Sequence, residues 1–154
     1  MRPRSILFVC LGNICRSPLA EGVFRHAVTA RGLQPMTITS AGLGGWHAGE
    51  PPDPRAIRIA AQSGIDISAQ RAHQIEPSDF GRFDLILGMD RSNVENLGRL
   101  RPASATADIA LFLEHALGHV EDVPDPYYGG DAGFRDALAL IETAAGALIE
   151  KISA

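Results

Sequence analysis

The sequence lacks any long apolar run and has almost no lysine. A helix that crosses a bilayer needs about 20 consecutive apolar residues, whereas the first apolar stretch runs only from Ile6 to Leu11. Lys151 is the one lysine among 14 basic residues, and 18 acidic residues give a formal net charge of −4. A broad polyanion-binding surface needs a cationic excess. We therefore expect neither a membrane nor a nucleic acid as a partner.

Cysteine is scarce as well. Cys10 and Cys15 lie five positions apart and cannot form a disulfide framework for a chain of 154 residues. Together with a histidine they do not have the usual ligand spacing of a zinc site, and we expect His26, His115 and His119 at the surface. The basic start resembles part of a signal peptide, but its apolar run is too short. We expect a cytoplasmic protein.

Short apolar segments alternate with amphipathic ones, which is typical of an α/β domain. The expected strands are residues 6–9, 36–40, 85–87 and 109–112. The expected helices run from 17–18 toward 32, from 53–54 to 64, from 90 to 100, and from 134 to 152 after a loop over 121–133. Such strands pair in parallel through right-handed crossovers. We therefore expect one domain, residues 1–154, with an open three-layer α/β sandwich. It would have a four-stranded parallel sheet, helices on both faces and a phosphate loop after the first strand.

The segment CLGNICRS, residues 10–17, is the expected phosphate loop. It lies between a buried strand and a helix for which Ser17 is the expected N-cap and Pro18 the first helical residue. Main-chain amides there can turn toward a tetrahedral dianion, and the loop lacks the GK[ST] ending of a Walker motif. The predicted phosphate-binding residues are Leu11, Gly12, Asn13, Ile14, Cys15, Arg16 and Ser17.

A thiol begins this loop and a guanidinium follows six positions later. Arg16 offers a planar fork for two phosphate oxygens. The inward amides, the helix dipole and Arg16 all favour the thiolate form of Cys10. A thiolate that faces a bound phosphorus atom is an in-line nucleophile. The plain structural alternative is a cysteine that ends a strand before an ordinary tight turn.

Expulsion of an alkoxide or phenolate also needs a general acid. Asp125 is the predicted acid because prolines flank it in VPDPYYGG, residues 123–130, and the glycines let the loop fold over a pocket. Asp122 is the rival carboxylate but lacks this framing. Asp90 is expected to be a helix cap rather than a second catalytic carboxylate.

The segments CLGNICRSPLAE, residues 10–21, and DPYYGG, residues 125–130, resemble the two signatures of low-molecular-weight protein tyrosine phosphatases. Segments 39–42, 46–49, 52–55 and 89–93 agree, so the resemblance covers essentially the whole chain. It implies hydrolysis of protein phosphotyrosine through a cysteinyl phosphate, without metal or cofactor. Cys10 would be the nucleophile, Arg16 the binder of phosphate and transition state, and Asp125 the acid and then the base. The resemblance also implies a loop-supporting network of Asn13, Ser17, Ser40 and His73, which would place the Ser17 hydroxyl near the Cys10 thiolate.

Aromatic walls that suit a phenyl ring are expected around this loop. The expected walls are Leu11, Trp46, His47, Tyr127 and Tyr128. The implied partners are a tyrosine-phosphorylated protein, with a bacterial tyrosine kinase as one candidate, and inorganic phosphate or another oxyanion in the loop. Cys15 either fills space or traps an oxidised Cys10 as a reversible disulfide.

Three other functions stay open at this stage. An arsenate reductase of the same fold would use two further cysteines, and none follows Cys15. The protein arginine phosphatases of the resembled family typically have threonine where this chain has Ile14, which favours phosphotyrosine. A binding module that only holds phosphate would not need Cys10, Arg16 and Asp125 together.

Overall fold

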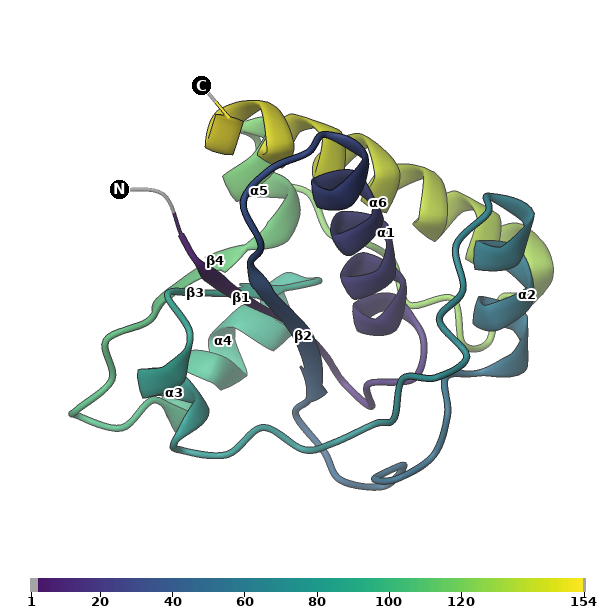
Figure 1. Ribbon diagram of the computed structural model, residues 1–154. Coiled ribbons are helices and arrows are strands. Elements are labelled where there is room, and N and C mark those ends of the chain that lie inside the picture. The colour runs from purple at the N-terminus through teal and green to yellow at the C-terminus, as the bar shows by residue number, and fades with distance from the viewer. Residues whose placement is uncertain (1–2, 154) are drawn as a thin grey trace.

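A parallel sheet with the strand order β2-β1-β3-β4 forms the middle layer of the computed structural model, which describes residues 3–153 (Figure 1). The strands are β1 (Ser5–Cys10), β2 (Thr37–Gly42), β3 (Leu85–Gly88) and β4 (Asp108–Leu111). The helices are α1 (Arg16–Ala30), α2 (Pro54–Gln62), α3 (Asp79–Arg82), α4 (Arg91–Leu100), α5 (Phe112–Leu117) and α6 (Gly130–Ser153). The four-stranded parallel sheet predicted from the sequence is confirmed.

Hydrophobic cores cover both faces of the sheet. Ile6 and Phe8 face the larger core, which α1, α2, α5 and α6 close. The Phe8 ring packs edge-on against Phe24 of α1 and Phe112 of α5, with centroids 5.8 and 5.2 Å apart. Leu7 and Val9 face the second core under α3 and α4. Because β1 is covered on both sides, its sequence is a continuous apolar run, and the expected three-layer sandwich is confirmed.

The start of α1 differs from the prediction. Cys15, not Ser17, is the N-cap residue, and no side chain caps this helix end. Ser17 is already inside the helix, and its hydroxyl contacts Cys10 and Asn13 instead. Pro18 is tolerated in the first turn because amides there have no intrahelical acceptor. The loop and the helix therefore share Arg16 and Ser17.

Two further segments differ from the expected pattern. Phe112 begins α5 rather than ending a strand, and this helix is too short for its periodicity to stand out in the sequence. The last helix begins at Gly130, inside the expected loop, although glycine is a weak helix former. Its predicted apolar face, from Phe134 to Ile152, is buried as expected. None of the helices within residues 3–153 is long and apolar enough to span a membrane.

The carboxyl ends of the strands bring four distant segments together. In the sheet register, Cys10 at the end of β1 lies beside Gly42 of β2, and Val9 lies beside Gly88 of β3. Just beyond the strands, the Leu43 amide donates to the Cys10 carbonyl at 3.0 Å. On the other side, Met89 connects Val9 to Val123 through two main-chain hydrogen bonds. The loops after β1, β2 and β3 and the segment around residue 123 thus meet at one edge.

Candidate active site

Cys10 lies at the centre of this edge, at the end of β1. Its residue is only 3% exposed, and its Sγ lies 3.0 Å from the Ser17 hydroxyl. The residues predicted to bind phosphate follow it directly and curve into the first turn of α1. The structure therefore places a thiol at the base of a loop that ends at a helix N-terminus.

The main-chain amides of residues 11–17 form a row of potential hydrogen-bond donors. Within residues 3–153, none of these amides donates a hydrogen bond to a backbone or side-chain acceptor. The loop is held by its carbonyls instead, because Leu11 accepts from Gly44 and Ile14 accepts from Asp53. Unpaired amides at a helix N-terminus are the groups that bind phosphate elsewhere. The loop can therefore offer donors to an oxyanion.

Arg16 is the largest of the fully buried side chains, with an exposed fraction of 2%. Its Nη1 donates to Asp90 Oδ2 at 2.6 Å and to the Val123 carbonyl at 2.9 Å, and its Nη2 lies 3.6 Å from Asp125 Oδ2. Burial lowers the pKa of Arg16, but the negative charges of Cys10, Asp90 and Asp125 outweigh it and raise the pKa above its ordinary value. In the part of the chain that the structure describes, Arg16 Nε is buried without any hydrogen-bond acceptor. The guanidinium is thus always charged, and its buried Nε donor is unused.

A chain of hydrogen bonds supports the loop from beneath. Asn13, which has a positive φ of 59°, donates through Nδ2 to Ser17 Oγ at 2.8 Å and to Ser40 Oγ at 3.0 Å. Its Oδ1 accepts from the main-chain amide of His73 at 3.0 Å. Asn13, Ser17 and Ser40 thus meet through their side chains, whereas His73 joins through its backbone and exposes its imidazole.

Glu21 ends this chain, and sequence reasoning missed it. The Ser40 hydroxyl donates to Glu21 Oε1 at 2.7 Å, so Ser40 can only accept from Asn13. Ser17 also accepts from Asn13, and its own proton can be donated to Cys10 Sγ. The Glu21 carboxylate and the Asn13 amide group fix the direction of the bonds that run from Glu21 to Ser17. The signal in the sequence was an acidic residue on a helix turn that is otherwise small and apolar.

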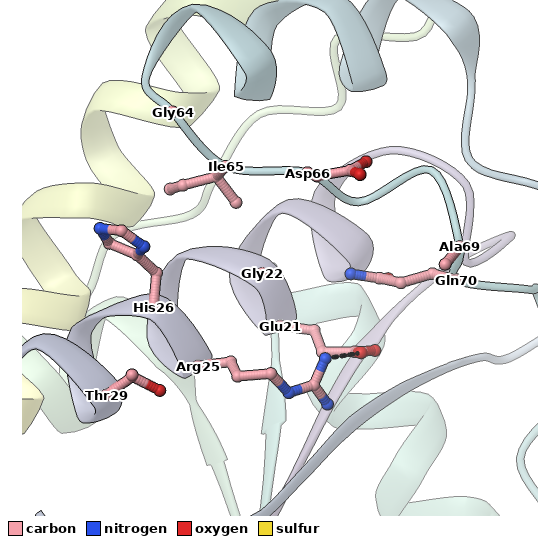
Figure 2. Close-up of a pocket in the computed structure, with 10 residues that line it drawn as sticks. All are labelled: Glu21, Gly22, Arg25, His26, Thr29, Gly64, Ile65, Asp66, Ala69 and Gln70. Atoms are coloured by element: carbon pink, nitrogen blue, oxygen red, sulfur yellow. Dashed lines mark hydrogen bonds and ion pairs between the residues drawn. The ribbon is translucent and has the colours of Figure 1, made fainter.

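Figure 2 shows Glu21 from its other side, in a hollow of about 420 Å³ between α1 and the segment from Gly64 to Gln70. Arg25 pairs with Glu21 there at 2.8 Å, one turn along α1. Cys10, Arg16 and Asp125 are not among the residues that line this hollow. Glu21 thus lies between this hollow and the hydrogen bonds that support the phosphate loop.

The two candidate acids lie in different surroundings. The side chain of Asp125 is 42% exposed, its Oδ1 accepts from the Tyr127 amide at 3.1 Å, and its Oδ2 faces Arg16. Asp122 instead accepts from the main-chain amide and the guanidinium of Arg91 at 3.0 and 3.1 Å. Of these two carboxylates, only that of Asp125 lies next to Arg16 of the phosphate loop.

The expected pocket walls lie on two sides of the loop. Leu11 and Trp46 are 48% and 69% exposed, and the His47 ring lies so close to Gly12 that a Cβ there would approach it within 3.1 Å. On the other side, Tyr127 stacks edge-on against Tyr128 with centroids 4.9 Å apart. Tyr128 is 93% exposed, so it stands out from the protein surface rather than against the loop.

Arg55 holds the tyrosine side of the site in place. Its guanidinium pairs with Asp53 and lies over the rings of Tyr127 and Phe134, at 5.6 and 4.6 Å from their centroids. The hydrogen bond from Arg55 lowers the pKa of Asp53 below its usual range. The Asp53 amide also donates to the Ile14 carbonyl. The start of α2 therefore links the phosphate loop to the loop that carries Asp125 and Tyr127, which we call the acid loop.

Asp90 is both a helix cap, as expected, and a partner of Arg16. Its Oδ1 accepts from the Asn93 amide at 2.7 Å in a capping box at the start of α4. Its other oxygen binds Arg16, which is 74 positions away in the sequence. The only sequence signal for this second contact was its place at the carboxyl end of a predicted strand.

Cys15 faces the interior. It is 4% exposed, and burial, together with the nearby negative charge of Asp53, raises the pKa of its thiol well above the ordinary value. Cys15 is therefore protonated at neutral pH. Both cysteines are reduced in the structure, and residues 3–153 contain no cluster of three His, Cys, Asp or Glu side chains that could hold a metal ion.

Known proteins are similar to this chain in sequence and in fold. Residues 5–154 match the family model described as "Low molecular weight phosphotyrosine protein phosphatase". A protein of that name from Schizosaccharomyces pombe is 48% identical over 134 residues, which cover 85% of each chain.

Solved structures agree with the sequence comparison. The crystal structure of Primo-1 has a TM-score of 0.91 and 35% identity, and the match covers 98% of this chain and 99% of that one. The Drosophila arginine phosphatase DARP has a TM-score of 0.90 and 33% identity, with 100% and 99% coverage. Vibrio vulnificus Wzb in complex with benzylphosphonate has a TM-score of 0.86 and 33% identity, with 97% and 99% coverage. This chain is therefore an enzyme that belongs to the low molecular weight phosphotyrosine protein phosphatase family.

Proposed function

We propose that this enzyme removes phosphate from phosphotyrosine in proteins, with Cys10 as nucleophile and Asp125 as general acid and base. One observation carries the proposal: among the residues that the structure describes, Arg16 Nε is buried without an acceptor beside a loop whose amides are also unpaired. A buried unsatisfied donor costs about 1–3 kcal/mol, which a bound oxyanion would recover. The benzylphosphonate complex of Wzb supports an aryl-substituted oxyanion as the ligand of such a loop.

In the first step, the Cys10 thiolate attacks the phosphorus of the bound monoester in line with the tyrosyl oxygen. The S–P bond forms as the P–O bond breaks, and Asp125 gives its proton to the departing phenolate. The loop amides and Arg16 bind the three non-bridging oxygens, where negative charge is concentrated in the transition state. The Ser17 hydroxyl, 3.0 Å from Cys10 Sγ, stabilises the thiolate before the attack.

In the second step, water hydrolyses the cysteinyl phosphate. The Asp125 carboxylate takes a proton from the attacking water, the S–P bond breaks, and inorganic phosphate leaves. Cys10 is again a thiolate and Asp125 is again protonated, so both groups return to their starting states. The exposure of Asp125 supports this role because both the leaving group and the water arrive from the solvent side.

Turnover of p-nitrophenyl phosphate and of a phosphotyrosine peptide by four proteins tests the proposal. We expect Cys10→Ser to be inactive but still to bind vanadate, and Asp125→Asn to lose about 10²–10⁴-fold in kcat. Asp122→Asn is the matched control, because its carboxylate lies in the same loop but faces Arg91. Activity in Cys10→Ser, or equal losses in the two aspartate variants, would refute the mechanism.

Phosphoarginine is a second candidate substrate, since the similar structure of DARP is that of an arginine phosphatase. Ile14 favours phosphotyrosine, because the arginine phosphatases of this family typically have threonine there. Assays of phosphoarginine and phosphotyrosine with the wild type and Ile14→Thr decide between them. We expect a preference for phosphotyrosine in the wild type that Ile14→Thr reduces.

We also propose that Cys15 protects the nucleophile from oxidation. Peroxide converts the Cys10 thiolate to a sulfenic acid, and the Cys15 thiol then condenses with it to form a disulfide and water. A thiol reductant restores both groups. The wild type should regain activity with dithiothreitol after peroxide treatment, whereas Cys15→Ser should regain much less, and equal recovery would refute this role.

A further inference from the structure

An apolar groove lies beside the phosphate loop and shares Leu11 and Trp46 with the expected pocket walls. It is a hollow of about 500 Å³ between the loop after β2 and the C-terminal half of α4. Such a volume falls within the range of about 300–1,000 Å³ that is usual for ligand clefts. Its floor and walls are Leu11, Leu43, Trp46 and Leu100, and Gln74 and Arg99 lie on its rim. We call it the Leu100 groove.

We propose that the Leu100 groove binds an apolar side chain of the phosphoprotein substrate, two residues away from the phosphotyrosine. The proposal rests on the function proposed above and adds a sequence preference to it. Such a preference would select among phosphotyrosine proteins, which the phosphate loop alone cannot do.

The groove is rigidly attached to the phosphate loop. Leu11 belongs to both, and main-chain hydrogen bonds of 3.0 Å join Leu43 to Cys10 and Gly44 to Leu11. The Gln74 side chain donates to the Leu43 carbonyl at 3.1 Å and fixes the opposite wall. The Trp46 ring rests on Gly44, where a Cβ would lie within 1.9 Å of it. A side chain in the groove therefore has a fixed place relative to a phosphate on Cys10.

The surface of the groove selects apolar groups. Leu11, Trp46 and Leu100 are among the large apolar side chains that are most exposed in the described residues, at 48%, 69% and 50%. None of the described residues that line the groove is acidic, and the guanidinium of Arg99, one of these residues, is paired with Glu95. Clustered exposed apolar side chains usually mark a binding surface.

The geometry of an extended peptide gives the position of the bound side chain. Side chains alternate between the two faces of an extended strand, and side chains on the same face are about 7 Å apart. When the phosphotyrosine points into the phosphate loop, its direct neighbours point away from the enzyme. The residues two positions before and after it point toward the enzyme, and one of them can reach the groove beside Leu11.

The test compares phosphotyrosine peptides with leucine or serine two residues before or two residues after the phosphotyrosine. We expect leucine at one of these positions to raise kcat/KM of the wild type roughly fivefold over serine. Leu100→Ser should abolish that preference and leave turnover of p-nitrophenyl phosphate unchanged. Val120→Ser is the matched control, since Val120 is 57% exposed but lies outside the groove.

Each result has one meaning. A leucine preference that Leu100→Ser removes and Val120→Ser keeps supports the groove as a substrate subsite. Turnover of all peptides without a preference, or a preference that Leu100→Ser retains, overturns it. A second copy of this chain as the occupant would appear as a dimer that Leu100→Ser dissociates without any change in peptide preference, which also overturns it. Failure of the proposed function would look different, because p-nitrophenyl phosphate would not be hydrolysed at all.

Discussion

Asp90 Oδ2 lies 2.6 Å from Arg16 Nη1 and forms an ion pair with a side chain that is almost completely buried. The same carboxylate caps α4 through its other oxygen. One residue therefore fixes both the first turn of a helix and the orientation of the guanidinium that faces the phosphate. The same Nη1 also donates a hydrogen bond to the Val123 carbonyl.

Substitution of Asp90 can separate these two contributions. Asp90→Asn keeps an oxygen that can cap α4 but removes the charge that orients Arg16, so we expect kcat for p-nitrophenyl phosphate to fall roughly tenfold or more. Asp90→Ala also loses the cap and should be about 1 kcal/mol less stable than Asp90→Asn. Urea unfolding with and without phosphate tests whether the charge of Asp90 acts on Arg16. Phosphate should stabilise Asp90→Asn more than the wild type, and equal stabilisation would contradict it.

Asn13 combines a positive φ with three side-chain hydrogen bonds, two of which are buried. Asn13→Gly removes the hydrogen bonds but suits the backbone, and we expect a loss of about 2 kcal/mol in the free energy of unfolding. Asn13→Ala adds the strain of a left-handed conformation, which costs about 1 kcal/mol more. Chemical denaturation of both variants measures the difference. Equal stability of the two would mean that the loop relaxes out of this conformation.

The buried Cys15 thiol should weaken the fold at alkaline pH. Its pKa is raised in the folded state, so above the ordinary value of 9.0 the unfolded chain loses this proton while the folded chain keeps it. The free energy of unfolding therefore falls as the pH rises. This group alone should lower it by about 1.4 kcal/mol at pH 10 in the wild type. The stability difference between Cys15→Ala and the wild type, measured by urea unfolding at pH 7 and pH 10, isolates the effect. A difference that does not change with pH would contradict it.

The stacking of Arg55 on Tyr127 predicts that the acid loop depends on α2. Arg55→Ala should lower kcat severalfold and speed chymotrypsin cleavage at Tyr127 or Tyr128, because the loop loses its contact with α2. Arg55→Lys keeps the charge but not the planar fork, so it should resemble Arg55→Ala. Arg31→Ala, which breaks the exposed pair with Glu150 on α6, is the control and should change neither measurement. Full activity of Arg55→Lys would show that charge alone is enough.

The sequence predicted the layers of the fold because each strand and helix carries its own periodic signal. The strand over Ile6–Val9 is covered on both faces and is therefore apolar throughout, which needs no knowledge of its neighbours. The phosphate loop was equally visible because its groups are consecutive in the chain. The short helix from Phe112 to Leu117 was not, since six residues carry less than two turns of pattern.

The contacts that sequence reasoning missed are those between distant segments. Glu21 meets Ser40 and Asp90 meets Arg16 only after the strands have paired, and neither glutamate nor aspartate has a local pattern that names its partner. The expected capping role of Ser17 was wrong for the same reason. The local pattern assigned its hydroxyl to the nearest amides, whereas the hydroxyl lies 3.0 Å from Cys10 Sγ, next to the thiol as the family resemblance implied.

The site draws its parts from segments far apart in the sequence, and this has a consequence for biosynthesis. The ribosome makes Cys10 and the loop that surrounds it before the Asp125 segment, which follows more than a hundred residues later. A nascent chain would thus hold a nucleophile before it holds the proton donor that completes turnover.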